Sequence, residues 1–146
     1  MSKWMLISEA WDLNEIAQKV GEALTALTLL KFIKIEGLNI EVNEADLKRK
    51  VVSVETILEA LLEEVKYVSK AGLSPTPLVE AIQEEYGYSD LKRIKTKIED
   101  VLKALEHLNK GTYLKRDFEE IERFLEGLAN KAASRSSDLI WRAGRY

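Results

Sequence analysis

The sequence contains no cysteine, and this absence excludes several kinds of chemistry at once. Folding cannot depend on disulfide bonds, and thiol catalysis, thiolate zinc sites and iron–sulfur ligation are all ruled out. Glutamine is also scarce, with two residues against 19 glutamates. A composition that is rich in charge and poor in labile side chains resembles that of heat-adapted proteins, so we expect a thermostable protein.

Long hydrophobic runs are missing as well. The longest apolar stretch, residues 23–35, is interrupted by Lys31 and Lys34 and is too short to span a bilayer. The apolar run near the start of the sequence is too short for a secretory signal. We therefore expect a cytoplasmic protein with no membrane role.

What remains is the composition of an ordinary globular protein. Of the 146 residues, 46% are hydrophobic and 32% are charged, and the net charge is −3. A chain of this length buries about 68–70% of its unfolded surface on folding. The sequence therefore predicts a single helical domain over residues 1–146.

Apolar residues recur at alternating steps of three and four in three stretches. This spacing places each row on one face of an α-helix, as packing between helices requires. A fourth row, from Ile16 to Leu30, is apolar nearly all round in its last turns and predicts a central helix. The three rows are Leu47, Val51, Val54, Leu58, Leu61, Val65 and Val68; Leu91, Ile94, Ile98, Val101, Leu105 and Leu108; and Phe118, Ile121, Leu125, Leu128 and Ala132. The pattern predicts an all-α fold, an antiparallel bundle of about five helices.

Capping residues set the expected helix boundaries. We predict helices from near Asp12, from Asn43 to Gly72, from Pro77 to Tyr86, from Ser89 to Asn109 and from near Asp117 to Trp141. Between the first two, alternation of apolar and polar residues predicts a small β-hairpin near residues 31–42. A frayed helix end followed by a loop is the alternative there.

The single histidine and the paired carboxylates give little indication of a catalytic site or a metal site. The single histidine, His107, falls at a solvent-facing position of its row and lacks the Glu-x-x-His pairing of di-iron bundles. The acidic pairs are Glu59/Glu63, Glu84/Glu85, Glu119/Glu122 and Glu122/Glu126. Helical pyrophosphatases bind magnesium through such carboxylates, but most of these lie outside the apolar rows, on an expected solvated face. We expect no catalytic residues, no metal site and no cofactor.

A basic run is the first candidate for a binding site. Residues 89–116 hold eight basic residues against four acidic ones, and Lys92, Arg93, Lys95 and Lys97 lie close together. The segment 77–109 superficially resembles a helix-turn-helix with a positively charged second helix. However, Gln83 and Arg93 occupy positions where that motif has a small and a buried aliphatic residue. These cations either contact nucleic acid or pair with neighbouring acidic helices.

The C-terminal stretch is the second candidate. Arginine and aromatic residues are enriched at interface hot spots, and here they alternate with small residues. The residues concerned are Arg135, Trp141, Arg142, Arg145 and Tyr146. They either bind a protein partner or a second copy of the chain, or dock on the protein's own core.

These observations favour a non-enzymatic helical interaction module, an accessory or assembly subunit of a larger complex. The first alternative is a DNA- or RNA-binding protein that uses the helix-turn-helix-like unit, and the second is a magnesium-dependent all-α hydrolase. No glycine cluster has the spacing of a phosphate loop or a dinucleotide fold, and no zinc-protease motif occurs.

Overall fold

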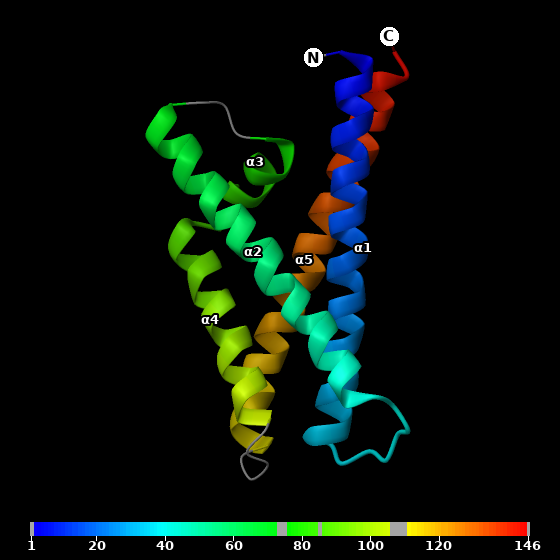
Figure 1. The fold of residues 1–146 in the computed structure, drawn as a ribbon, viewed down its shortest axis with the longest axis vertical. Coiled ribbons are helices and arrows are strands. Elements are labelled where there is room, and N and C mark those ends of the chain that lie inside the picture. Colours follow the sequence, from blue (N-terminus) through cyan, green and yellow to red (C-terminus); the bar gives the residue numbers. More distant parts are fainter. Residues whose placement is uncertain (1, 73–75, 85, 106–110, 146) are drawn as a thin grey trace.

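The computed structural model describes residues 2–72, 76–84, 86–105 and 111–145. These ranges form five helices and contain no strand, so the all-α class is confirmed (Figure 1). The helices are α1 (Lys3–Lys34), α2 (Glu44–Ala71), α3 (Pro77–Gln83), α4 (Tyr88–Leu105) and α5 (Gly111–Ala143).

The longest helices, α1 and α5, run antiparallel side by side, so that the two ends of the chain lie at the same end of the bundle (Figure 1). Helix α2 crosses this pair and leans away from α1 toward its own C-terminus. Helix α4 packs on α2 and α5, whereas the short α3 packs mainly on α5. Toward the end of the bundle that holds both termini, α3 therefore lies between α2 and α5 (Figure 1).

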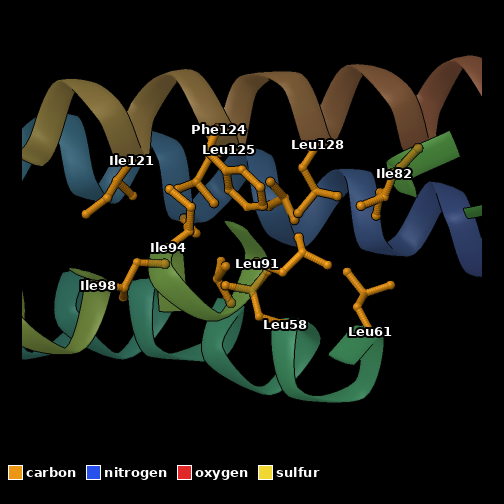
Figure 2. Packing of buried hydrophobic residues seen from close by; sticks show 14 of the residues in the cluster. Leu58, Leu61, Ile82, Leu91, Ile94, Ile98, Ile121, Phe124, Leu125 and Leu128 are labelled. Carbon is orange, nitrogen blue, oxygen red and sulfur yellow. The ribbon is translucent and has the colours of Figure 1, made fainter. Parts of the chain in front are cut away.

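The predicted apolar rows form the core. In α2, α4 and α5 every described side chain of the three rows is buried except Val68, which is half-buried. Leu108 lies outside the described residues, as does His107. Figure 2 shows the α5 row facing leucine and isoleucine side chains of α2 and α4, with Ile82 of α3 closing one end. The three-and-four periodicity thus identified the packing faces correctly.

Small residues let α1 and α5 approach closely. Ala10, Ala23 and Ala26 of α1 are buried, as are Ala132 and Ala143 of α5. Between the two helices, the buried Ser136 hydroxyl donates a hydrogen bond of 2.7 Å to the carbonyl oxygen of Ala10. This bond satisfies a polar side chain that would otherwise be buried at a cost.

The predicted β-hairpin near residues 31–42 is wrong. No ladder forms over these residues: α1 continues to Lys34 with its C-cap at Ile35, and the chain then turns at Gly37, which adopts a left-handed conformation (φ 72°). The Leu38 N–H donates back to the Phe32 carbonyl at 2.9 Å and so satisfies one of the last carbonyl groups of the helix. The alternating residues Leu38, Ile40 and Val42 stay exposed, since no neighbouring element covers them. The alternative, a helix end followed by a loop, is what the chain adopts.

Several helix boundaries also differ from the prediction. Helix α1 begins at Lys3 rather than near Asp12, because the Ser2 hydroxyl caps it by accepting from the Met5 N–H at 3.3 Å. The last helix begins at Gly111, ahead of the predicted Asp117, and α3 ends at Gln83 rather than Tyr86. The caps of α2 are as predicted: Asn43 accepts from the Asp46 N–H at 3.2 Å, and Gly72 closes the helix in the left-handed region.

The start of α4 shows why its predicted cap was wrong. Ser89 lies inside the helix, which begins at Tyr88. The Asp90 carboxylate instead accepts from the Gly87 N–H at 3.1 Å, so an acidic residue of the first turn reaches back to the residue before the helix. Serine at this position was therefore a misleading signal.

Truncating a side chain at the centre of the core tests this packing. Leu125 is fully buried against α2 and α4, so we expect Leu125→Ala to lower the free energy of unfolding by about 2–5 kcal/mol. Leu38→Ala, in the loop after α1, removes the same atoms from a half-exposed position and should cost less than about 0.5 kcal/mol. Urea unfolding followed by circular dichroism measures both. Equal losses in the two variants would contradict the assigned core.

Candidate interaction surfaces

All three tryptophans of the chain are exposed, and they lie toward one end of the bundle. The exposed fractions are 77% for Trp4, 72% for Trp11 and 67% for Trp141. Three tryptophans with so much of their surface exposed are unusual in a region that contacts only water, because the indole ring is mostly apolar. We call the exposed aromatic, aliphatic and arginine side chains of this end the tip surface: Trp4, Met5 and Trp11 of α1 with Ile140, Trp141, Arg142 and Arg145 of α5.

Helical geometry links these side chains. Trp4 and Trp11 are seven residues apart and therefore lie on the same side of α1, two turns from each other. Trp11 and Ile140 line one groove between α1 and α5. The Arg145 guanidinium lies 5.2 Å from the centre of the Trp141 ring, within cation–π range. The tip surface thus combines both helices of the central pair.

Charge around the tip surface differs between its outermost turns and its groove. Residues 2–8 and 139–145 contain Lys3, Arg142 and Arg145 and no aspartate or glutamate, although the chain as a whole carries −3. The groove that Trp11 and Ile140 line is acidic, since Asp12 and Glu15 line it as well.

The predicted C-terminal residues divide into two groups. Trp141, Arg142 and Arg145 belong to the tip surface. Arg135 instead pairs with Glu84 just beyond the end of α3 at 2.9 Å, so it helps to fasten α3 to α5. Tyr146 lies outside the described residues. The sequence did not single out Trp4 and Trp11, although their seven-residue spacing near a helix start was a usable signal.

The predicted basic run is largely paired with carboxylates of neighbouring helices. Lys97 and Arg93 both bind Glu120 of α5, and Lys97 also lies 3.5 Å from Asp117. Lys95 reaches Glu59 of α2 at 2.9 Å. Lys92 alone of the four predicted cations is exposed with no ion pair to another described residue.

Titration behaviour follows from these pairs. Hydrogen bonds from Lys97 and Arg93 lower the pKa of Glu120, and the same bonds raise the pKa of both cations. The pKa of Lys95 is raised by its bond to Glu59. Glu55 has a raised pKa, mainly because it is partly buried and secondarily because Glu99 is near. These shifts have a structural origin in the contacts between helices.

The helix-turn-helix-like unit does not pack as that motif does. Its short helix, α3, lies mainly on α5, and its long helix, α4, lies on α2 and α5. Three of the five cations on α4 reach sideways to these neighbouring helices, as described above. A recognition helix needs its charged face free to enter a groove of DNA. On α4 only Lys92 and Lys103, near opposite ends of the helix, are exposed with no ion pair to a described residue.

Of the paired carboxylates, Glu85 lies outside the described residues, and the others belong to α2, α5 and the end of α3. Over the described ranges, no group of three or more histidine, aspartate or glutamate side chains could hold a metal ion. Glu122 accepts from Lys31 at 2.7 Å and from the Thr28 hydroxyl at 3.1 Å, so it joins α5 to α1. Glu59 is engaged by Lys95.

Comparison of the chain with protein-family models, with curated proteins and with solved structures gives no match in any of the three. Among the described residues, no helix has the length and apolar character needed to cross a membrane.

Replacing Glu120 tests the ion-pair interpretation through pH. Because the pKa of Glu120 is lowered in the folded protein, its stabilisation is present above the ordinary value of 4.5 and is lost as the pH falls through the lower folded value. We expect Glu120→Gln to lower the free energy of unfolding by up to about 1 kcal/mol at neutral pH, since the pair is partly exposed. In strongly acidic solution the two proteins should become equally stable.

Urea unfolding at a series of pH values, from neutral to strongly acidic, measures the free energy of unfolding of wild type and variant. Glu119→Gln is the matched control, because Glu119 is exposed and has no ion pair to another described residue. A difference between wild type and Glu120→Gln that stays unchanged in acid would show that the carboxylate charge is not its source.

Proposed function

We propose that this protein is a non-enzymatic helical interaction module, an accessory or assembly subunit that binds another protein through the tip surface. The observation that carries the proposal is the exposure of all three tryptophans toward one end of the α1–α5 pair. Tryptophan and arginine are the residue types most enriched at interface hot spots. Both are present here, with Met5 and Ile140 adding apolar area.

The charge of the tip surface favours a different protein over a second copy. A symmetric dimer places the same patch on both subunits, so the outermost turns of two copies, with Lys3, Arg142 and Arg145 and no carboxylate in residues 2–8 and 139–145, would lie close together. Like charges brought together in this way oppose association. At these turns, the partner that fits best presents apolar side chains beside aspartate and glutamate.

The distribution of perturbed groups supports a binding role without catalysis. Catalytic residues are usually titratable groups with shifted pKa values that converge in a cleft. Among the residues that the structure describes, the groups with shifted pKa values are Glu55, Arg93, Lys95, Lys97 and Glu120. Four of these five belong to ion pairs between helices, where the shift follows from the pairing itself.

A nucleic-acid-binding role is the alternative, and one observation favours it. Tyr88, Ser89, Lys92 and Thr96 line one shallow hollow at the start of α4, together with Arg93 and Lys97. The carboxylates bound to Arg93 and Lys97 offset much of its positive charge. Duplex binding that weakens steeply with salt, and less steeply after Lys92→Ala and Arg93→Ala, would favour this alternative.

Removing the tryptophans tests the proposal. The variant Trp4→Ser, Trp11→Ser, Trp141→Ser removes the aromatic part of the tip surface, and each lost hot-spot residue typically costs about 2 kcal/mol of binding, or roughly 30-fold in affinity. We expect the variant to fold normally, because the three rings are exposed. It should also lose the proteins that co-purify with the wild type from source cells at stoichiometric level.

The control is Val52→Ser, Tyr67→Ser, which removes two exposed apolar side chains of α2 away from the tip. It should retain the same co-purifying proteins. Light scattering on each purified protein reports its mass in isolation, and we expect monomers throughout. The proposal is wrong if the triple variant keeps the same partners, or if both variants lose them equally.

A further inference from the structure

Helices α1 and α5 each carry a second row of residues at alternating steps of three and four, and these second rows are exposed. Each row lies beside the row that its helix buries in the core. Spacing of this kind places a row on one face of a helix, where a neighbouring helix can pack. The exposed rows are Trp4, Ser8, Trp11, Glu15 and Gln18 in α1, and Ala133, Ser137 and Ile140 in α5.

The two exposed rows border one groove. Its volume is about 630 Å³, and the described residues that line it all come from α1 and α5. Trp11 borders the groove from α1 and Ile140 borders it from α5, whereas Ala133, Ser136 and Ser137 contribute side chains too small to fill it. How closely two helices approach depends on the side chains between them, and small ones allow a short distance. The groove therefore has the form that accepts a third helix beside an existing pair.

Charge changes sign between the groove and the outermost turns of the pair. Asp12 and Glu15 are the charged residues among the described lining of the groove, and they lie nine and twelve residues after Lys3. At the helical rise of 1.5 Å per residue this separation is about 13–18 Å. The cations Arg142 and Arg145 lie at the same outer turns as Lys3. A ligand that complements both regions is therefore elongated, with opposite charges at its two ends.

Glu15 has one ion pair within the protein, to Lys19 at 3.2 Å. Both side chains are more than half exposed, and the two residues are four apart on α1. Such a pair contributes little and is readily exchanged for another. Asp12 has no ion pair with a described residue. Both carboxylates are therefore able to meet a cation of a bound helix.

We infer that this groove binds an amphipathic α-helix of the partner protein, with its acidic end at the outer turns and its basic end over Asp12 and Glu15. The inference rests on the function proposed above and specifies the structure that the partner presents. Apolar side chains at every third and fourth position of the helix contact Trp4, Trp11 and Ile140, as in other complexes of a helix in a groove. A second copy fits less well, because a symmetric contact brings groove against groove and fills neither.

Two synthetic peptides of about 21 residues, long enough as helices to span the row from Trp4 to Gln18, test the inference. Both have leucine at steps of three and four, two lysines, two glutamates and no tryptophan. The segregated peptide has both glutamates at one end and both lysines at the other, and the mixed peptide has one of each at both ends. All three tryptophans of the chain belong to the tip surface, so their fluorescence reports docking. We expect the segregated peptide to shift their emission to shorter wavelength and to bind about tenfold more tightly than the mixed peptide.

Matched variants locate the peptide. Ser137→Gln places a larger side chain in the groove from an exposed position and should weaken binding of the segregated peptide at least about tenfold. Ser134→Gln is the control, because Ser134 is exposed on α5 and does not line the groove. The variant Asp12→Asn, Glu15→Gln should reduce the preference for the segregated peptide to about threefold, since only the cations of the outer turns then distinguish its ends. Circular dichroism confirms that each variant is folded.

Equal affinity for the two peptides, or no change in tryptophan emission with either, would overturn the inference. Wild-type affinity of the segregated peptide for Ser137→Gln would overturn it as well, and so would a dimer of the isolated protein in light scattering.

Co-purification from source cells separates this inference from the proposed function. Partners that are lost from the tryptophan variant but retained by Ser137→Gln would contradict docking in the groove and leave the proposed function in place. Partners that the tryptophan variant retains would contradict both.

Discussion

The close antiparallel packing of α1 against α5 is the contact on which the rest of the structure depends. Alanine side chains of both helices are buried, and the Ser136 hydroxyl donates a hydrogen bond to the Ala10 carbonyl oxygen across the contact. These two helices are the longest in the chain, with 32 and 33 residues, so the pair spans about 50 Å. Since α2 leans away from the pair toward one end, the termini of α1 and α5 extend beyond the shared core (Figure 1). The tip surface is exposed for this reason.

Ion pairs between the helices support the same arrangement. Ion pairs join α5 to α1 through Glu122 and Lys31, α5 to α4 through Glu120, and α4 to α2 through Lys95 and Glu59. Individually such pairs contribute little at the surface. Together, however, they favour the observed arrangement of neighbouring helices. They also pair most of the cations of α4 with carboxylates of α2 and α5. Arg142 and Arg145 of the tip surface differ from these residues because neither has an ion pair with a described residue.

Sequence reasoning recovered what is local and periodic. The packing faces of α2, α4 and α5 and the caps at Asn43 and Gly72 follow from residue spacing and from the conformations that asparagine and glycine favour. The prediction of a hairpin was wrong because the alternation of apolar and polar residues near 31–42 belongs to the end of α1 and an exposed loop. A strand would have needed a second strand to pair with, and the fold provides none among its described residues.

The candidate sites were harder to predict, since they depend on contacts between distant segments. Whether Lys97 meets solvent or Glu120 is decided by the placement of α5 beside α4, which no local pattern encodes. The exposure of Trp141 was foreseeable from its place outside the α5 row. That of Trp4 and Trp11 was missed, because α1 was expected to begin near Asp12 and their seven-residue spacing was not used. Trp11 and Ile140 are far apart in sequence and share a groove only through the packing of α1 against α5.

The central claim is that α1 and α5 hold the tip surface as a rigid, preformed end of the bundle. Native-state amide hydrogen exchange, read residue by residue, tests it most directly. The account predicts that residues 6–13 and 132–140 exchange about as slowly as residues 23–30 and 121–128, because the same pair of helices protects them all. Exchange at the rate of an unstructured peptide in the first two segments, with protection kept in the last two, would contradict it.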